Sequence, residues 1–80
     1  MASSIGVVVR GACGRVGREV VGAVARQTDM RLVGAVDAAA PGPSLALPTG
    51  GTVPLGKETA AILDQARPQV LVDFTAPGVV

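Results

Sequence analysis

Hydrophobic residues are concentrated in three short runs, which are separated by segments with a different period. The runs cover residues 5–9, 30–36 and 70–74 and are rich in valine. Apolar runs of this length are typical of strands whose two faces are both covered. The pattern therefore predicts three buried strands.

Two intervening segments have the spacing of helices. Residues 15–27 predict an amphipathic helix of about three turns, and residues 57–66 predict a second, shorter helix. A third helix is expected to begin at Pro77, because proline suits the first position of a helix. The inward face of the first helix is predicted to consist of Gly17, Val20, Val21 and Val24.

The order β-α-β-α-β with apolar strands predicts an α/β fold, the N-terminal part of a Rossmann-like doubly wound parallel sheet. Residues 38–51, rich in proline, glycine and alanine, are expected to form an irregular surface loop. The fourth strand of such a fold pairs with the first. Residues 70–74 are predicted to be the third strand, so residues 5–9 are expected to form an unprotected, hydrophobic edge. We therefore expect residues 1–80 to be the N-terminal part of a dinucleotide-binding domain from a longer protein, without its C-terminal substrate and catalytic domain.

The first predicted strand runs into three evenly spaced glycines in the segment RGACGRVGREV. Gly14 and Gly17 match the last two glycines of the G-x-G-x-x-G template of dinucleotide-binding folds. The template would place its first glycine at position 12, which is Ala12 here, and the glycine lies instead at Gly11. The loop is therefore one residue longer than the common form. A pyrophosphate needs backbone N–H groups, a helix N-terminus and no obstructing side chains. The predicted cofactor-binding residues of this segment are Gly11, Ala12, Cys13, Gly14, Arg15, Val16 and Gly17.

Asp37 ends the second predicted strand, where the dinucleotide motif places an acid that binds the adenosine ribose. Its carboxylate repels a 2′-phosphate, and the alanines at 38–40 supply no arginine to bind one, so NAD(H) is favoured over NADP(H). Arg15 or Lys57 could still reach a phosphate, which leaves NADP(H) open. The competing interpretation is a glycine-rich turn with an unrelated surface acid.

Composition narrows the function classes. The absence of histidine excludes His-ligated metal sites and His-based triads within this chain, and we predict no metal site. The single cysteine, Cys13, excludes an intrachain disulfide and is expected to act through its backbone alone. A net charge of +1 favours neither nucleic acid nor a membrane surface as a partner. With no apolar stretch long enough for a signal peptide or membrane span, a cytoplasmic location is expected.

The segment VLVDFTAPGVV, downstream of GACGRVGREV and LVGAVD, resembles the N-terminal domain of the 4-hydroxy-tetrahydrodipicolinate reductase (dihydrodipicolinate reductase) family. The D-F-T-x-P strand end is more particular to that family than the glycine loop. The resemblance covers the chain from Ile5 onward. It implies an NAD(P)H-dependent oxidoreductase that reduces 4-hydroxy-tetrahydrodipicolinate in the diaminopimelate route to lysine.

The resemblance also implies roles for individual residues. The glycine loop becomes the pyrophosphate loop, Asp37 the ribose acid, Thr75 a polar contact beside the nicotinamide, and Asp73 a structural acid. Some members carry an arginine directly after the ribose acid, where this chain has Ala38.

The family's catalytic groups lie beyond the last residue of this sequence, so no catalytic residue is assigned. The chain alone is expected to be inactive, with the substrate bound mainly by the missing domain of a homotetrameric parent. Two alternatives remain: an atypical short-chain dehydrogenase-like protein, which commonly lacks D-F-T-x-P, and a non-catalytic NAD(H)-sensing domain. The residues that follow this sequence would distinguish them.

Overall fold

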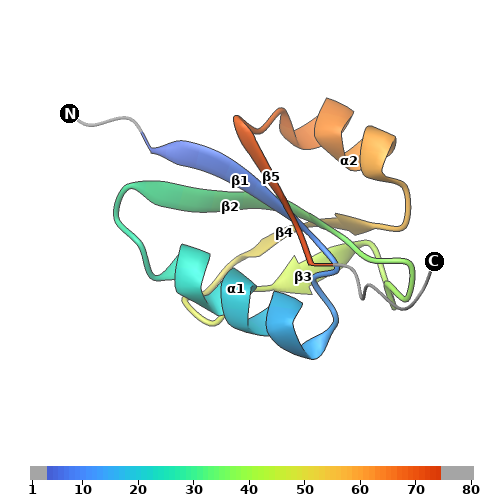
Figure 1. Cartoon of the computed structure of the whole chain (residues 1–80), viewed down its shortest axis with the longest axis horizontal. Helices are drawn as coiled ribbons and strands as arrows, with labels where there is room; N and C mark the ends of the chain where they lie inside the picture. Colours follow the sequence, from blue (N-terminus) through green and yellow to red (C-terminus); the bar gives the residue numbers. More distant parts are fainter. Residues whose placement is uncertain (1–3, 75–80) are drawn as a thin grey trace.

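Strand β1 (Ile5–Arg10) runs through the middle of a five-stranded sheet with the order β3-β4-β2-β1-β5 (Figure 1). This computed structural model describes residues 4–74. The strands β2 (Met30–Val36) and β5 (Val70–Asp73) pair with β1 in parallel on either side. The four inner residues of β1 are buried. Its valines suit this position, because β-branched side chains pack well in a strand covered on both faces.

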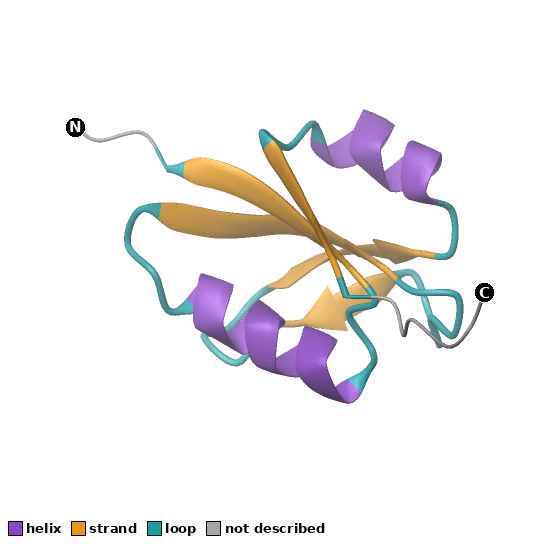
Figure 2. Cartoon of the chain, in the orientation of Figure 1, coloured by secondary structure: helices purple, strands orange, loops and turns teal. Residues whose placement is uncertain are grey.

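The two helices cover opposite faces of the sheet (Figure 2). Successive strand residues point to opposite faces. Val7 and Val9 of β1 belong to the core beneath α1 (Arg15–Ala25), whereas Val8 packs in a cluster with Ile62 of α2 (Thr59–Ala66). The α/β, Rossmann-like class predicted from the sequence is thus confirmed.

The inward face of α1 differs slightly from the prediction. Gly17, Val21 and Val24 are buried as expected, and Val20 is half-buried. Gly22, which is not part of the predicted inward face, is also buried. The side chain of Arg26 explains this difference, since its Nη1 lies 3.3 Å from the place of a Cβ at Gly22.

The prediction of an irregular loop over residues 38–51 was wrong in part. The chain forms β3 (Ser44–Ala46), which pairs antiparallel with β4 (Thr52–Gly56), and β4 pairs in parallel with β2. Val53 and Leu55 of β4 are buried in the core. The proline between them obscured a strand whose residues alternate between buried and more exposed positions.

The predicted place of the last strand was also wrong. Because β4 occupies the outer side of β2, β5 pairs with β1 and takes the fourth strand's position. β1 is therefore central, and β5 is the sheet edge in the part of the chain that the structure describes. The helix predicted at Pro77 lies outside the described residues.

Among residues 4–74, neither helix has the length and apolar character needed to cross a membrane.

Candidate functional site

The carboxyl end of β1 lies between the carboxyl ends of β2 and β5, and helices follow β1 and β4 on opposite faces. Ligands of open α/β sheets bind in the crevice at such a topological switch point. A hollow of about 730 Å³ lies there. It is lined by the glycine loop, the residues that follow β2, the end of β5, and Lys57.

The backbone of the glycine loop is tied to the end of β2. Gly11 has a φ of +82°, a conformation that favours glycine. The N–H groups of Gly11 and Ala12 both donate to the carbonyl oxygen of Val36, at 2.7 and 3.2 Å. The Gly14 N–H donates to the Gly11 carbonyl at 3.2 Å. These three N–H groups are thus engaged within the protein. The N–H groups available to a ligand lie further along the chain, in the first turn of α1.

The N-terminus of α1 supplies those donors. The N–H groups at the start of a helix have no intrahelical acceptor. Gly14, the N-cap, offers no side chain to accept them, and the first turn contains no acidic residue. Gly14, Arg15 and Val16 line the hollow. An uncapped helix N-terminus facing an open hollow is suited to an anion such as a phosphate.

Gly17 allows the helix to sit directly against the loop. A Cβ at this position would lie 1.8 Å from the Gly11 carbonyl oxygen and 2.7 Å from its carbon. Backbone atoms cannot yield to such an overlap, so a side chain here would displace the helix. The close approach of the helix to the loop therefore explains why this position is a glycine.

Asp37 is half-buried and links three segments of backbone. Its Oδ2 accepts the N–H of Cys13 and its Oδ1 accepts the N–H of Ala39, both at 2.8 Å. Its own N–H donates to the carbonyl oxygen of Gly56 at 3.0 Å. Sequence reasoning missed this bracing role, for which Asp37 alone gave no signal. A carboxylate oxygen has more than one acceptor site, so a ribose hydroxyl can still be bound.

Cys13 presents its backbone to the site. Burial raises the pKa of the Cys13 thiol, and the nearby Asp37 carboxylate raises it further, while Arg18 acts in the opposite direction. The thiol therefore remains protonated near neutral pH and is a poor nucleophile. This agrees with the expectation that Cys13 acts through its N–H and not through its sulfur.

An ion pair joins the carboxyl ends of β1 and β5. Arg10 Nη1 lies 3.2 Å from Asp73 Oδ2, and both side chains are about half exposed, at 46% and 45%. Asp73, for which a structural role was expected, is the last residue of β5 and lines the hollow. Sequence reasoning missed Arg10, although a basic residue between an apolar strand and a glycine loop was a usable signal.

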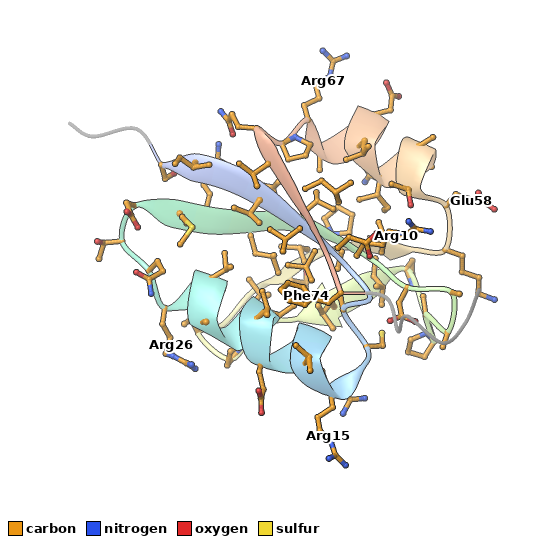
Figure 3. The ribbon with its side chains drawn as sticks, in the orientation of Figure 1. Arg10, Arg15, Arg26, Glu58, Arg67 and Phe74 are labelled. Carbon is orange, nitrogen blue, oxygen red and sulfur yellow. The ribbon has the colours of Figure 1, made fainter. Side chains whose placement is uncertain are left out.

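The other predicted site residues are placed as follows. The Arg15 side chain extends away from the sheet (Figure 3). Phe74, which was not among the predicted site residues, also lines the hollow, and its N–H donates to the Arg10 carbonyl at 2.8 Å. Thr75, predicted to contact the cofactor, lies outside the described residues.

Comparison with known proteins gives a consistent result. Residues 5–80 match the family described as dihydrodipicolinate reductase, N-terminus. The chain is 44% identical over 72 residues to the 4-hydroxy-tetrahydrodipicolinate reductase of Dehalococcoides mccartyi, covering 89% of this chain and 27% of the relative. It is 39% identical over 79 residues to the reductase of that name from Moorella thermoacetica, covering 94% and 29%.

A third relative, the 4-hydroxy-tetrahydrodipicolinate reductase of Desulfitobacterium hafniense, is 43% identical over 77 residues, covering 91% of this chain and 29% of its own. The chain thus spans less than a third of the length of these relatives. The short-chain dehydrogenase-like alternative is not favoured by these matches. By its sequence from residue 5 onward, the chain belongs to the family of dihydrodipicolinate reductase N-termini.

Proposed function

We propose that this chain is the nicotinamide-dinucleotide-binding part of a 4-hydroxy-tetrahydrodipicolinate reductase. The observation that carries the proposal is the uncapped N-terminus of α1, which opens onto the hollow between the ends of β2 and β5. Three relatives carry the reductase name over chains more than three times as long. The catalytic and substrate-binding residues accordingly belong to the rest of the protein.

The residues of the chain suit a dinucleotide. The N–H groups of Arg15 and Val16, which line the hollow in the first turn of α1, are in position to donate to the pyrophosphate. Gly14 keeps the approach free of a side chain. Asp37 accepts a ribose hydroxyl while it holds the loop. When bound, the nicotinamide supplies the hydride that reduces the substrate.

The preferred cofactor in this proposal is NAD(H). The Asp37 carboxylate lies where the adenosine ribose binds in folds of this kind, and it repels a 2′-phosphate. Ala38 and Ala39, which line the hollow after it, provide no cation.

The proposal extends to the whole protein. Its substrate is a small molecule held mainly by a second domain, and the assembly is a cytoplasmic homotetramer. In this proposal Thr75 supplies a polar contact to the nicotinamide. Since this chain contributes one part of the cleft, we expect it to show no reductase turnover by itself.

Calorimetry and a turnover assay test the proposal together. NADH titrated into the 80-residue chain and into the full-length protein is expected to bind both, and the full-length protein alone is expected to oxidise NADH with the substrate. Absence of binding in both would contradict the cofactor site. Binding without turnover by the full-length protein would instead favour a non-catalytic NAD(H)-sensing domain.

A further inference from the structure

Lys57 lies beside Asp37 although the two residues are far apart in the sequence. Val36 and Gly56 are paired neighbours of β2 and β4, and the Asp37 N–H donates to the Gly56 carbonyl at 3.0 Å. Adjacent strands are separated by about 4.8 Å. The backbone of Lys57, the next residue, therefore emerges next to Asp37 at the same edge of the sheet.

The Lys57 side chain is available to a ligand. It is exposed and lines the same hollow as Asp37 and Ala38. Within residues 4–74 it forms no ion pair and no side-chain hydrogen bond. Glu58, the nearest acid in sequence, does not line the hollow, and its side chain extends outward (Figure 3).

The other cations around the hollow serve different parts of it. Arg10 pairs with Asp73 at the ends of β1 and β5, on the opposite side of the glycine loop from β4. Arg15 begins α1, where the pyrophosphate is proposed to bind, and its side chain extends away from the sheet. Among the cations that line the hollow, Lys57 is therefore the one that lies next to Asp37, where the adenosine ribose is proposed to bind.

We propose that Lys57 binds the 2′-phosphate of NADP(H) and thereby allows this site to use both dinucleotides. The inference rests on the proposed function, because the position of the adenosine ribose follows from Asp37. Asp37 already accepts two backbone N–H groups, which direct its oxygens toward the loop and the Ala39 turn. The Lys57 backbone emerges about one strand spacing from Asp37, so its flexible side chain can bring a cation to a phosphate bound there and offset the repulsion by the remaining carboxylate charge.

Titration of the full-length protein with NADPH and NADH tests this role. Lys57→Ala is expected to raise the Kd for NADPH about fivefold, the size of one exposed ion pair, and to leave the Kd for NADH nearly unchanged. Lys57→Arg keeps the charge and is expected to retain NADPH binding. Arg26→Gln, at the far end of α1, is the control that removes one exposed positive charge away from the hollow. Raising the ionic strength should shrink the difference between wild type and Lys57→Ala.

The outcomes separate this inference from the proposed function. An equal loss of NADH and NADPH affinity in Lys57→Ala would place Lys57 at a part common to both dinucleotides and overturn the inference. Unchanged NADPH affinity, or wild-type protein that binds NADH and not NADPH, would overturn it as well. In these cases the proposed function stands. Failure of the wild type to bind either dinucleotide would overturn both.

Discussion

The N–H of Cys13 donates a hydrogen bond of 2.8 Å to Oδ2 of Asp37, although 24 residues separate the two in the sequence. This bond fastens the glycine loop to the end of β2. The other carboxylate oxygen holds the N–H of Ala39, so one side chain fixes the two segments that border the proposed ribose and pyrophosphate positions. Asp37 thus has a structural role besides the ribose contact predicted for it.

Replacing Asp37 is expected to weaken both the fold and the binding of NADH. Asp37→Ala leaves the Cys13 and Ala39 N–H groups without their acceptor, at a cost of about 1 kcal/mol in the free energy of unfolding, because the carboxylate is half-buried. Asp37→Asn keeps one acceptor oxygen and should lose less. Urea unfolding and calorimetry measure the two effects. An unchanged free energy of unfolding in Asp37→Ala would contradict the bracing role.

Two glycines of the same loop are expected to respond differently to alanine. Gly17→Ala places a Cβ 1.8 Å from the Gly11 carbonyl oxygen, so it should destabilise the fold by at least about 2 kcal/mol. At Gly14 the nearest atom to a Cβ is that same oxygen at 3.5 Å, an ordinary contact. Gly14→Ala should therefore destabilise the fold much less than Gly17→Ala, by the small cost of alanine at an N-cap, but bind NADH more weakly. Thermal melts and titrations separate these effects, and a stable Gly17→Ala protein would contradict the close approach.

The reactivity of Cys13 should report on its surroundings. Burial, and secondly Asp37, raise the thiol pKa, so the folded chain holds this proton over a pH range in which the unfolded chain has lost it. The resulting stability is complete below the ordinary thiol pKa and is lost as the pH rises through the raised value. Alkylation rates measured against pH should show a higher midpoint in folded than in urea-unfolded protein.

Asp37→Asn is the matched variant for this measurement. It should lower the alkylation midpoint but leave it above that of the unfolded chain, because burial is the larger cause. A folded midpoint at or below the unfolded one would contradict the pKa direction.

The ion pair between Arg10 and Asp73 is expected to contribute little to stability. Both side chains are about half exposed, so water and salt screen their attraction. A double-mutant cycle with Arg10→Gln and Asp73→Asn should give a coupling free energy below about 1 kcal/mol, decreasing further at high salt. A coupling well above that value, insensitive to salt, would show that the pair is more enclosed than the structure indicates.

Local pattern in the sequence was sufficient for much of the fold. The valine-rich runs predicted β1, β2 and β5 to within one residue at each end, and the apolar spacing predicted α1 and α2 with ends that differ by no more than two residues. These elements were predictable because strand and helix periods are written in consecutive residues. The glycine loop was predictable for the same reason, since its spacing and the strand before it are local features.

The tertiary structure decided which elements are neighbours. The sequence did not show that β4 occupies the outer side of β2 and leaves the β1 edge to β5, because strand pairing is a competition between distant segments. It also did not show that Asp37 would brace Cys13 or that Lys57 would emerge beside Asp37. The sequence by itself thus determined the elements and the loop that begins α1. Only the packed sheet, which brings the carboxyl ends of parallel strands to one edge, decided which side chains share the site.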